Sequence, residues 1–378
     1  MQHRWDIFCT VIDNFGDIGV CWRLARQLAS EHHQTVRLWV DDLNSFAAIA
    51  PAINPNISRQ IVHDIEVCSW HKPFAAVESA EVVIEAFACE LPDRYVIAML
   101  QKNKPPVWIN LEYLSAEPWV AQYHAVPSPH PRFPLIKTCF FPGFVAGTGG
   151  LLREKNLITQ RQAFNASAEW EFLQRKDLPG READELRMSL FCYDSVPIEK
   201  LIQILSQTKV PVLLIVPQGK VAEKIAAMLN PTSSQNNVSL KCGYLTVQVI
   251  PFMEQTDYDR LLWSCDVNFV RGEDSFVRAQ WGSNPFIWNI YPQAEGVHWK
   301  KLHAFLDLYC SNMTIELAVA VREMWSCWNG IGEINHGVWM NFLSARESLK
   351  HHNDHWLKQL LKQNDLASSL VQFSMNQL

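Results

Sequence analysis

The chain has 378 residues, with 33 basic and 39 acidic side chains and a formal net charge of −6. This balance disfavours a general nucleic-acid binder, which would carry an excess of basic residues. The length suits two α/β domains, and a composition of 48% hydrophobic and 19% charged residues is typical of a folded protein rather than a disordered one.

The first half of the chain alternates predicted strands and helices. Residues 5–12 are rich in β-branched and aromatic side chains and predict a strand, and apolar residues at helical spacing over residues 18–28 predict a helix. Residues 35–40, 82–84 and 107–110 predict further buried strands. Apolar strands separated by helices indicate a parallel sheet that is covered on both faces.

A polar turn follows the first predicted strand. It contains Asp13, Asn14, Gly16, Asp17 and Gly19. Two carboxylates on one glycine turn can serve as a general base and its helper. An equally good interpretation is that one of the two aspartates caps the following helix. A dinucleotide site is a third, weaker interpretation, because the turn lacks the first glycine of the Gly-x-Gly-x-x-Gly pattern.

Two later stretches of the first half are less regular. Glu112 and Tyr113 follow a buried strand, and we expect them on the side that receives the acceptor. The proline-rich residues 127–134 exclude a helix or a central strand. The polar residues 177–184 predict a linker, which ends a first domain at residue 183.

The second half repeats the alternation of strands and helices. Predicted strands cover residues 187–192, 210–216, 246–250, 267–270 and 286–288, and predicted helices cover residues 198–205, 221–229 and 257–264. The tail from about residue 315 is helical by periodicity. We therefore predict two doubly wound Rossmann-like domains. The first spans residues 1–183, completed by a C-terminal helix over 356–378, and the second spans 184–355.

A second polar loop connects the predicted strand 267–270 to a helix that opens at Ser275. A strand that ends at Arg271 and Gly272 and feeds a helix N-terminus presents backbone N–H groups and positive charge to a phosphate. The alternative is a well-capped helix, since Glu273 and Asp274 also suit a first turn. Because Glu273 beside a phosphate would be repelled, we expect it to act on a hydroxyl or to orient another group.

Three residues of the second half suit a nucleobase. Phe252 and Gln255 follow a predicted strand, and Tyr193 follows another. An aromatic ring with an amide can stack on a base and bind its edge, although packed loop aromatics are the simpler interpretation. In open parallel sheets, ligands bind beyond the carboxyl ends of the strands. We therefore expect both polar loops to face one cleft between the domains.

Two patterns that resemble metal sites are interpreted as structural. Asp257 and Asp259 form an Asp-x-Asp pattern, but they lie at the start of a helix, where acids favour the dipole. His351 and His355 are one helical turn apart without a third ligand nearby, so we expect a solvated helix face. The ten cysteines form no Cys-x-x-Cys pair, which disfavours a zinc site.

The order of several motifs resembles the EarP family of protein-arginine rhamnosyltransferases, which act on translation elongation factor P. The resemblance covers most of the chain. Its motifs are Ile-Asp-Asn-Phe-Gly-Asp-Ile-Gly at 12–19, Asn-Leu-Glu-Tyr-Leu-Ser at 110–115, Phe-Pro-Gly-Phe at 141–144 with Thr-Gly-Gly-Leu at 148–151, and Val-Arg-Gly-Glu-Asp-Ser at 270–275.

The resemblance implies a two-domain GT-B glycosyltransferase, an enzyme of post-translational modification. It would move L-rhamnose from dTDP-β-L-rhamnose to an arginine of elongation factor P with inversion. Asp13, Asp17 and Glu273 would be catalytic. From the chemistry of a guanidinium acceptor we expect Asp17 to be the base and Asp13 to orient the guanidinium, and we expect no metal or cofactor. Donor contacts would come from the residues that match the family's motifs, namely Asn14, Phe15, Gly16, Tyr193, Phe252, Gln255, Arg271, Gly272, Glu273, Asp274 and Ser275.

Other functions remain as alternatives at this point. One is a GT-B transferase with another nucleotide sugar or a small-molecule acceptor. Another is a non-enzymatic nucleotide-binding partner of a translation factor, and a third is a nicotinamide-dependent oxidoreductase. The sequence shows no signal peptide and no apolar run of the roughly 20 residues that span a membrane, so we predict a cytoplasmic protein.

Overall fold

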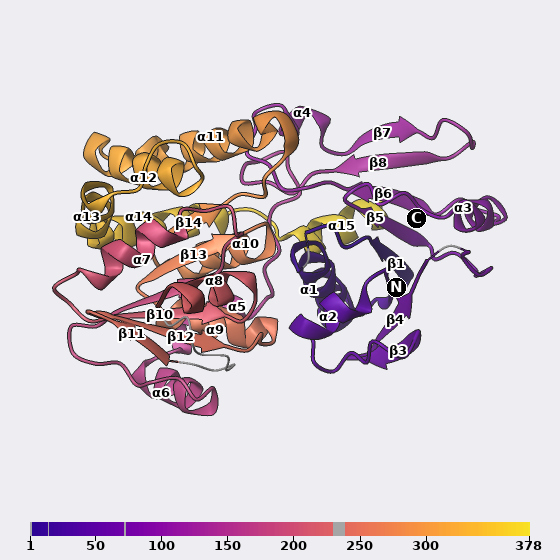
Figure 1. The fold of residues 1–378 in the computed structure, drawn as a ribbon. Coiled ribbons are helices and arrows are strands. Elements are labelled where there is room, and N and C mark those ends of the chain that lie inside the picture. Colours follow the sequence, from indigo (N-terminus) through magenta and orange to yellow (C-terminus); the bar gives the residue numbers. More distant parts are fainter. Residues whose placement is uncertain (1, 14, 72, 230–238) are drawn as a thin grey trace. The chain divides into compact units, whose positions relative to one another are not determined.

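The computed structural model describes residues 2–13, 15–71, 73–229 and 239–378 (Figure 1). The chain divides into two compact units. Unit 1 comprises Met1–Lys155 with Leu360–Leu378, and unit 2 comprises Asn156–Gln359. Each unit is built around one β-sheet in which most strands are parallel.

Unit 1 has an eight-stranded sheet in the order β3-β4-β2-β1-β5-β6-β8-β7. Its strands are β1 (Arg4–Cys9), β2 (Thr35–Val40), β3 (Arg59–Val62), β4 (Ile65–Ser69), β5 (Val82–Ala86), β6 (Val107–Leu111), β7 (Val126–Pro129) and β8 (Ile136–Phe140). The central strands pair in parallel, whereas β3 and β7 run antiparallel at the two edges. The proline-rich stretch thus forms an edge strand, where its missing N–H groups cost no central hydrogen bond.

Helices cover both faces of the unit 1 sheet. They are α1 (Gly16–Ser30), α2 (Leu43–Ile49), α3 (Asp93–Leu100), α4 (Val120–Tyr123) and α15 (Leu366–Met375). Phe8 of β1 packs against Tyr95 of α3, and the neighbouring Cys9 points to the opposite face and contacts Cys21 of α1. The C-terminal segment is anchored here, since Gln27 of α1 donates a hydrogen bond of 3.0 Å to Asp365.

Unit 2 has a six-stranded sheet in the order β11-β12-β10-β9-β13-β14. Its strands are β9 (Leu186–Leu190), β10 (Val212–Pro217), β11 (Ser239–Cys242), β12 (Leu245–Ile250), β13 (Val267–Arg271) and β14 (Phe286–Asn289). Only β11, at one edge, pairs antiparallel. This sheet was predicted almost strand for strand, because its central strands are continuous apolar runs.

The helices of unit 2 fall into two groups along the chain. The first group is α5 (Leu157–Ala163), α6 (Ala166–Arg175), α7 (Ile198–Ser206), α8 (Lys220–Leu229), α9 (Gln255–Ser264) and α10 (Asp274–Gly282). The second group is η1 (Ala294–Gly296), α11 (Val297–Tyr309), η2 (Cys310–Asn312), α12 (Ile315–Trp328), α13 (His336–Ser344) and α14 (Arg346–Leu360). The predicted helical tail corresponds to α12 to α15.

The first boundary between the units lies between residues 155 and 156, whereas the sequence analysis placed it after residue 183. The intervening α5 and α6 pack in unit 2, where Phe172 of α6 belongs to a core cluster with Leu213 of β10. The polar stretch that was interpreted as a linker is also tied to this unit, because Arg181 forms an ion pair of 2.8 Å with Asp266. Arg181 therefore ties this stretch to unit 2.

Candidate functional site

In unit 1, β1 has β2 on one side and β5 on the other, so the strand order reverses at this point. Ligands of open parallel sheets bind beyond the carboxyl ends of the strands at such a reversal. The segment that leaves the sheet after β1 and enters the first turn of α1 carries Asp13, Gly16 and Asp17, and we call it the acid turn. Asn14, which the sequence analysis assigned to donor binding, lies outside the described residues, and Phe15 occupies the N-cap position of α1.

Asp17 holds the acid turn together. Its Oδ2 atom accepts hydrogen bonds of 2.8 Å from the backbone N–H groups of both Ile12 and Asp13. The N–H of Gly16 donates to the carbonyl oxygen of Asp13 at 2.6 Å. A Cβ atom at Gly16 would lie 2.6 Å from Oδ2 of Asp13, so only glycine lets that carboxylate take this position. The capping interpretation is thus replaced by one in which Asp17 folds the turn that precedes its helix.

Asp17 is only 2% exposed, and this burial changes its acidity. Desolvation raises the pKa of Asp17, and the nearby charge of Asp41 raises it further. The N–H groups of Asp13 and Ile12 and the hydroxyl of Tyr113 oppose this rise. The balance leaves the pKa above its ordinary value, which makes Asp17 a stronger base than a solvated aspartate.

The two predicted acceptor-side residues, Glu112 and Tyr113, have different partners in the structure. Tyr113, which follows β6, hydrogen-bonds to Asp17 and stacks on Phe87 with ring centroids 4.4 Å apart. Glu112 instead accepts a hydrogen bond of 2.5 Å from the side chain of Asn110. Sequence reasoning missed Phe87, because an apolar residue after a buried strand carries no distinctive pattern.

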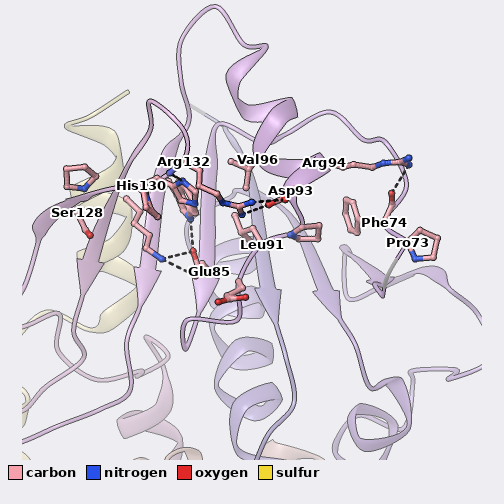
Figure 2. A pocket seen from close by; sticks show the side chains of 16 residues that line it. Pro73, Phe74, Glu85, Leu91, Asp93, Arg94, Val96, Ser128, His130 and Arg132 are labelled. Carbon is pink, nitrogen blue, oxygen red and sulfur yellow. Dashed lines mark hydrogen bonds and ion pairs between the residues drawn. The ribbon is translucent and has the colours of Figure 1, made fainter.

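Unit 1 also contains a pocket of about 730 Å³ (Figure 2). Its buried carboxylate Glu85 accepts hydrogen bonds from the indole N–H of Trp108 at 3.1 Å and from Lys137 Nζ at 3.2 Å. Arg132 and Asp93 form a pair of 2.7 Å, also drawn in Figure 2. The hydrogen bonds from Trp108 and Lys137 explain why the carboxylate of Glu85 is tolerated at a buried position. The described lining residues do not include the acid turn.

In unit 2, the strand order reverses between β9 and β13, and the segment Arg271–Ser275 leaves the sheet at this point. We call it the arginine loop. Gly272 has a φ of 59°, a conformation that glycine adopts without strain. The indole N–H of Trp288 donates to the carbonyl oxygen of Gly272 at 2.7 Å and fixes the loop from the neighbouring β14.

Ser275 closes the arginine loop. Its Oγ atom accepts a hydrogen bond of 3.0 Å from the N–H of Arg271 and donates one of 2.6 Å to the carbonyl oxygen of the same residue. The N-cap position of α10 belongs to Glu273, whose side chain makes no capping hydrogen bond in the described structure. The N-terminus of α10 therefore receives no capping hydrogen bond from the Glu273 side chain, and its backbone N–H groups and positive dipole end point toward the arginine loop.

Aromatic side chains fix the guanidinium of Arg271. Its Cζ atom lies 4.3 Å from the ring centroid of Phe191 and 4.7 Å from that of Tyr193, both of which follow β9. Its Nη1 atom also donates to the carbonyl oxygen of Cys192 at 3.3 Å. Such stacking holds the guanidinium in one orientation.

The predicted nucleobase residues lie at the same edge of the unit 2 sheet. Phe252, which follows β12, packs edge-on against Phe191 with ring centroids 6.2 Å apart. Gln255 donates a hydrogen bond of 3.1 Å to the carboxylate of Asp274 in the first turn of α10. The structure therefore brings all the described donor-side residues of unit 2 together at the carboxyl ends of β9, β12 and β13.

The Asp-x-Asp pattern is used in ion pairs. Asp257 is paired with Lys176 at 2.5 Å and with Arg175 and Arg260 at 2.8 Å each. Asp259 forms a buried bidentate pair with Arg278. Within the described part of the chain, no group of three or more His, Cys, Asp or Glu side chains is arranged to hold a metal ion. Over the same residues, no helix has the length and apolarity that crossing a bilayer requires.

Comparison with known proteins gives matches over the full length. The model of the EarP family, described as elongation factor P rhamnosyltransferase, matches residues 5–375. A protein-arginine rhamnosyltransferase of Pseudomonas aeruginosa is 46% identical, with 98% of each chain covered. One from Pseudomonas putida is 45% identical, with both chains covered completely.

Solved structures agree with these sequence matches. One solved structure concerns EarP-mediated arginine glycosylation of translation elongation factor EF-P. It matches this chain with a TM-score of 0.71 at 33% identity, and both chains are covered completely. A UDP-glucosyltransferase from Polygonum tinctorium has a TM-score of 0.54 at 8% identity, which shows a shared fold alone. The α/β fold of GT-B type that the sequence resemblance implied is thereby confirmed.

Proposed function

This chain belongs to the EarP family of elongation factor P rhamnosyltransferases, and we propose that it transfers L-rhamnose from dTDP-β-L-rhamnose to an arginine of elongation factor P. It is a glycosyltransferase by this membership. The match of the family model over residues 5–375 carries the proposal. The two groups of polar residues at the strand-order reversals supply the chemistry.

Unit 2 is proposed to bind the donor. Arg271, held by its aromatic neighbours, and the first turn of α10 would stabilise the diphosphate as it leaves. Phe252, Gln255 and Tyr193 would bind the thymine base by stacking and hydrogen bonding. Glu273, which a diphosphate would repel, would accept a hydrogen bond from a sugar hydroxyl.

Unit 1 is proposed to activate the acceptor. An arginine guanidinium is charged and delocalised, so it has no good nucleophilic lone pair until one nitrogen loses a proton. Asp17 takes this proton, and Asp13 orients the guanidinium. The nitrogen then forms a bond to the anomeric carbon as the bond from that carbon to dTDP breaks. Asn14, Phe15 and Gly16 would contribute to the donor side, and Glu112 and Tyr113 to the acceptor side.

Two further expectations belong to this proposal. Because Arg271 and a helix N-terminus supply the positive charge at the diphosphate, we expect transfer to continue in excess EDTA. Because the acceptor is a translation factor, we expect the protein to act in the cytoplasm without binding nucleic acid or membrane itself.

The configuration of the product tests the donor and the mechanism. A single displacement on dTDP-β-L-rhamnose inverts the anomeric carbon, so NMR of the modified acceptor should show an α-rhamnosyl arginine. UDP- and GDP-sugars offered at the same concentration should give little product. A β-linked product would contradict inversion, and equal transfer from a UDP-sugar would contradict the proposed donor.

A further inference from the structure

A left-handed stretch of backbone directly follows β5. Phe87, Ala88 and Glu90 have φ angles of 57°, 54° and 51°. These conformations are unfavourable for residues with a Cβ atom, and they persist where the surrounding structure imposes them, often at functional sites. Three left-handed residues within a stretch of four, beside the strand-order reversal of unit 1, point to a functional role for this stretch.

The neighbouring strand β6 imposes this conformation. The N–H of Phe87 donates to the carbonyl oxygen of Leu111 at 2.7 Å. The N–H of Ala88 donates to the side-chain oxygen of Asn110 at 3.2 Å. A third hydrogen bond, of 3.2 Å, joins the N–H of Cys89 to the carbonyl oxygen of Ala86. These hydrogen bonds from the backbone N–H groups of residues 87–89 therefore set the direction in which Phe87 projects.

The ring of Phe87 is placed against Tyr113. The two rings are nearly parallel, with an angle of 16° between their planes and 4.4 Å between their centroids. Phe87 is 7% exposed, so its ring is largely shielded from water, whereas Tyr113 is half-buried. The hydroxyl of Tyr113 hydrogen-bonds to Asp17. A chain of contacts thus runs from the left-handed stretch through Tyr113 to the acid turn.

The strand order explains why these residues meet. The residues Asp17, Phe87 and Tyr113 follow β1, β5 and β6, which are consecutive parallel neighbours in the sheet. Their carboxyl ends therefore lie at one edge, where the acid turn also leaves the sheet. A tyrosine side chain without a fixed ring would sample several rotamers there and would hold Asp17 only part of the time.

We propose that Phe87 is a positioning residue, whose ring fixes Tyr113 so that the Tyr113 hydroxyl holds the Asp17 carboxylate in place. The inference rests on the proposed function for its role in catalysis. Its geometric content, that Phe87 acts on Asp17 through Tyr113, can be tested without any transfer reaction.

The charged and titratable groups that face Asp17 define the expected direction. Asp41 and burial raise the pKa of Asp17, whereas the hydrogen bonds from Asp13, Ile12 and Tyr113 lower it. Loss of the Tyr113 hydroxyl therefore raises the pKa of Asp17 further. Loss of the Phe87 ring should act in the same direction but less strongly, because Tyr113 then keeps its hydroxyl and loses only its fixed orientation.

The experiment is a carbon-13 NMR titration of aspartate carboxyl groups in the full chain, without donor or acceptor. The signal of Asp17 is identified by its loss in Asp17→Asn. We expect its midpoint at higher pH in Tyr113→Phe and, by a smaller shift, in Phe87→Leu and Phe87→Met. Phe87→Tyr keeps a ring and should stay close to the wild type. Phe172→Leu removes a comparably buried ring in unit 2 and should leave the midpoint unchanged.

The double variant Phe87→Leu/Tyr113→Phe decides whether Phe87 acts through Tyr113. If it does, the double variant shifts the midpoint no further than Tyr113→Phe alone. Shifts that add, or wild-type midpoints in both Phe87→Leu and Phe87→Met, would overturn the inference. In active protein, the acidic limb of the kcat profile should move with the same order among variants. Absence of transfer by the wild type would contradict only the proposed function, since the titration does not depend on it.

Discussion

At the scale of single residues, the proposed function gives Asp17 two tasks. Its Oδ2 atom accepts hydrogen bonds from two backbone N–H groups, which is a structural role that an amide oxygen can also fill. Its negative charge, in contrast, would be needed only to accept a proton in the proposed reaction. The two tasks can therefore be separated by a substitution that keeps the oxygen and removes the charge, whereas alanine would remove both.

We expect Asp17→Asn to fold with nearly normal affinity for the donor but to lose about 10²- to 10⁴-fold in kcat, the range for loss of a general base. Steady-state kinetics with calorimetry of donor binding measures both quantities. The matched control is Asp42→Asn, since Asp42 also accepts a backbone N–H, that of Asn44, at 2.9 Å, and does not shift the pKa of Asp17. Normal turnover in Asp17→Asn would remove Asp17 as the base and favour Asp13.

Arg271 is predicted to act in donor binding. Replacing it by alanine removes a fixed cation from the proposed diphosphate site, and we expect the Kd for dTDP-rhamnose to rise by about 10- to 100-fold, as for loss of a charged hydrogen bond. Arg271→Lys should recover part of this loss, because it keeps the charge but not the planar stack. Arg346→Ala, at a half-buried arginine of α14 in the same unit, serves as the control in calorimetry. Unchanged donor affinity in Arg271→Ala would contradict the diphosphate role.

Which residues could be predicted from the sequence depends on whether their task leaves a local pattern. Asp13, Gly16 and Asp17 form a recognisable glycine turn, and Arg271 to Ser275 form a recognisable strand-to-helix loop. Phe87 left no such pattern, because its left-handed backbone is set by Leu111 and Asn110 of a different strand. The raised pKa of Asp17 could not be predicted from the sequence either, since it depends on burial and on the hydrogen bond from Tyr113.

At the scale of elements, the central parallel strands β1, β2, β5 and β6 were predicted from the sequence. The parallel strands β4 and β8 and the antiparallel edge strands were not. β3 and β4 form a hairpin whose two turn residues, His63 and Asp64, have φ angles of 50° and 61°. This turn type usually contains Asn-Gly or a similar pair, and His-Asp gives no such signal. β11 was missed for a related reason, since only Leu240 of its residues is buried and the strand lacks an apolar run.

A buried ion pair joins the two helices that flank the donor-side residues. Arg278 of α10 binds both carboxylate oxygens of Asp259 in α9, at 2.9 and 2.7 Å. We expect Asp259→Asn to destabilise unit 2 by about 3–5 kcal/mol, because it leaves a buried guanidinium without its counter-charge. Urea unfolding followed by tryptophan fluorescence measures this loss.

The matched control for this element is an exposed ion pair of the same unit. Lys200 and Glu333 lie 3.2 Å apart with side chains 53% and 73% exposed. Lys200→Ala should change the stability by only about 0–1 kcal/mol. Equal effects of Asp259→Asn and Lys200→Ala would show that the buried pair contributes no more than a surface one.

At the scale of the whole molecule, the sequence predicted two doubly wound sheets, and the structure places the first boundary at residue 155 rather than 183. The polar composition of residues 177–184 is typical of a linker and predicted the boundary there, but Arg181 of this stretch forms an ion pair with Asp266 inside unit 2. The function followed from the order of four motifs along the chain, and full-length matches to the EarP family support it.

The intact mass of elongation factor P, after incubation with this protein and dTDP-β-L-rhamnose, tests the central claim most directly. We predict a gain of one deoxyhexose, located on an arginine by fragmentation and strongly slowed by Asp17→Asn. An acceptor whose mass stays unchanged under conditions where donor binds, or a sugar found on a residue other than arginine, would contradict the account.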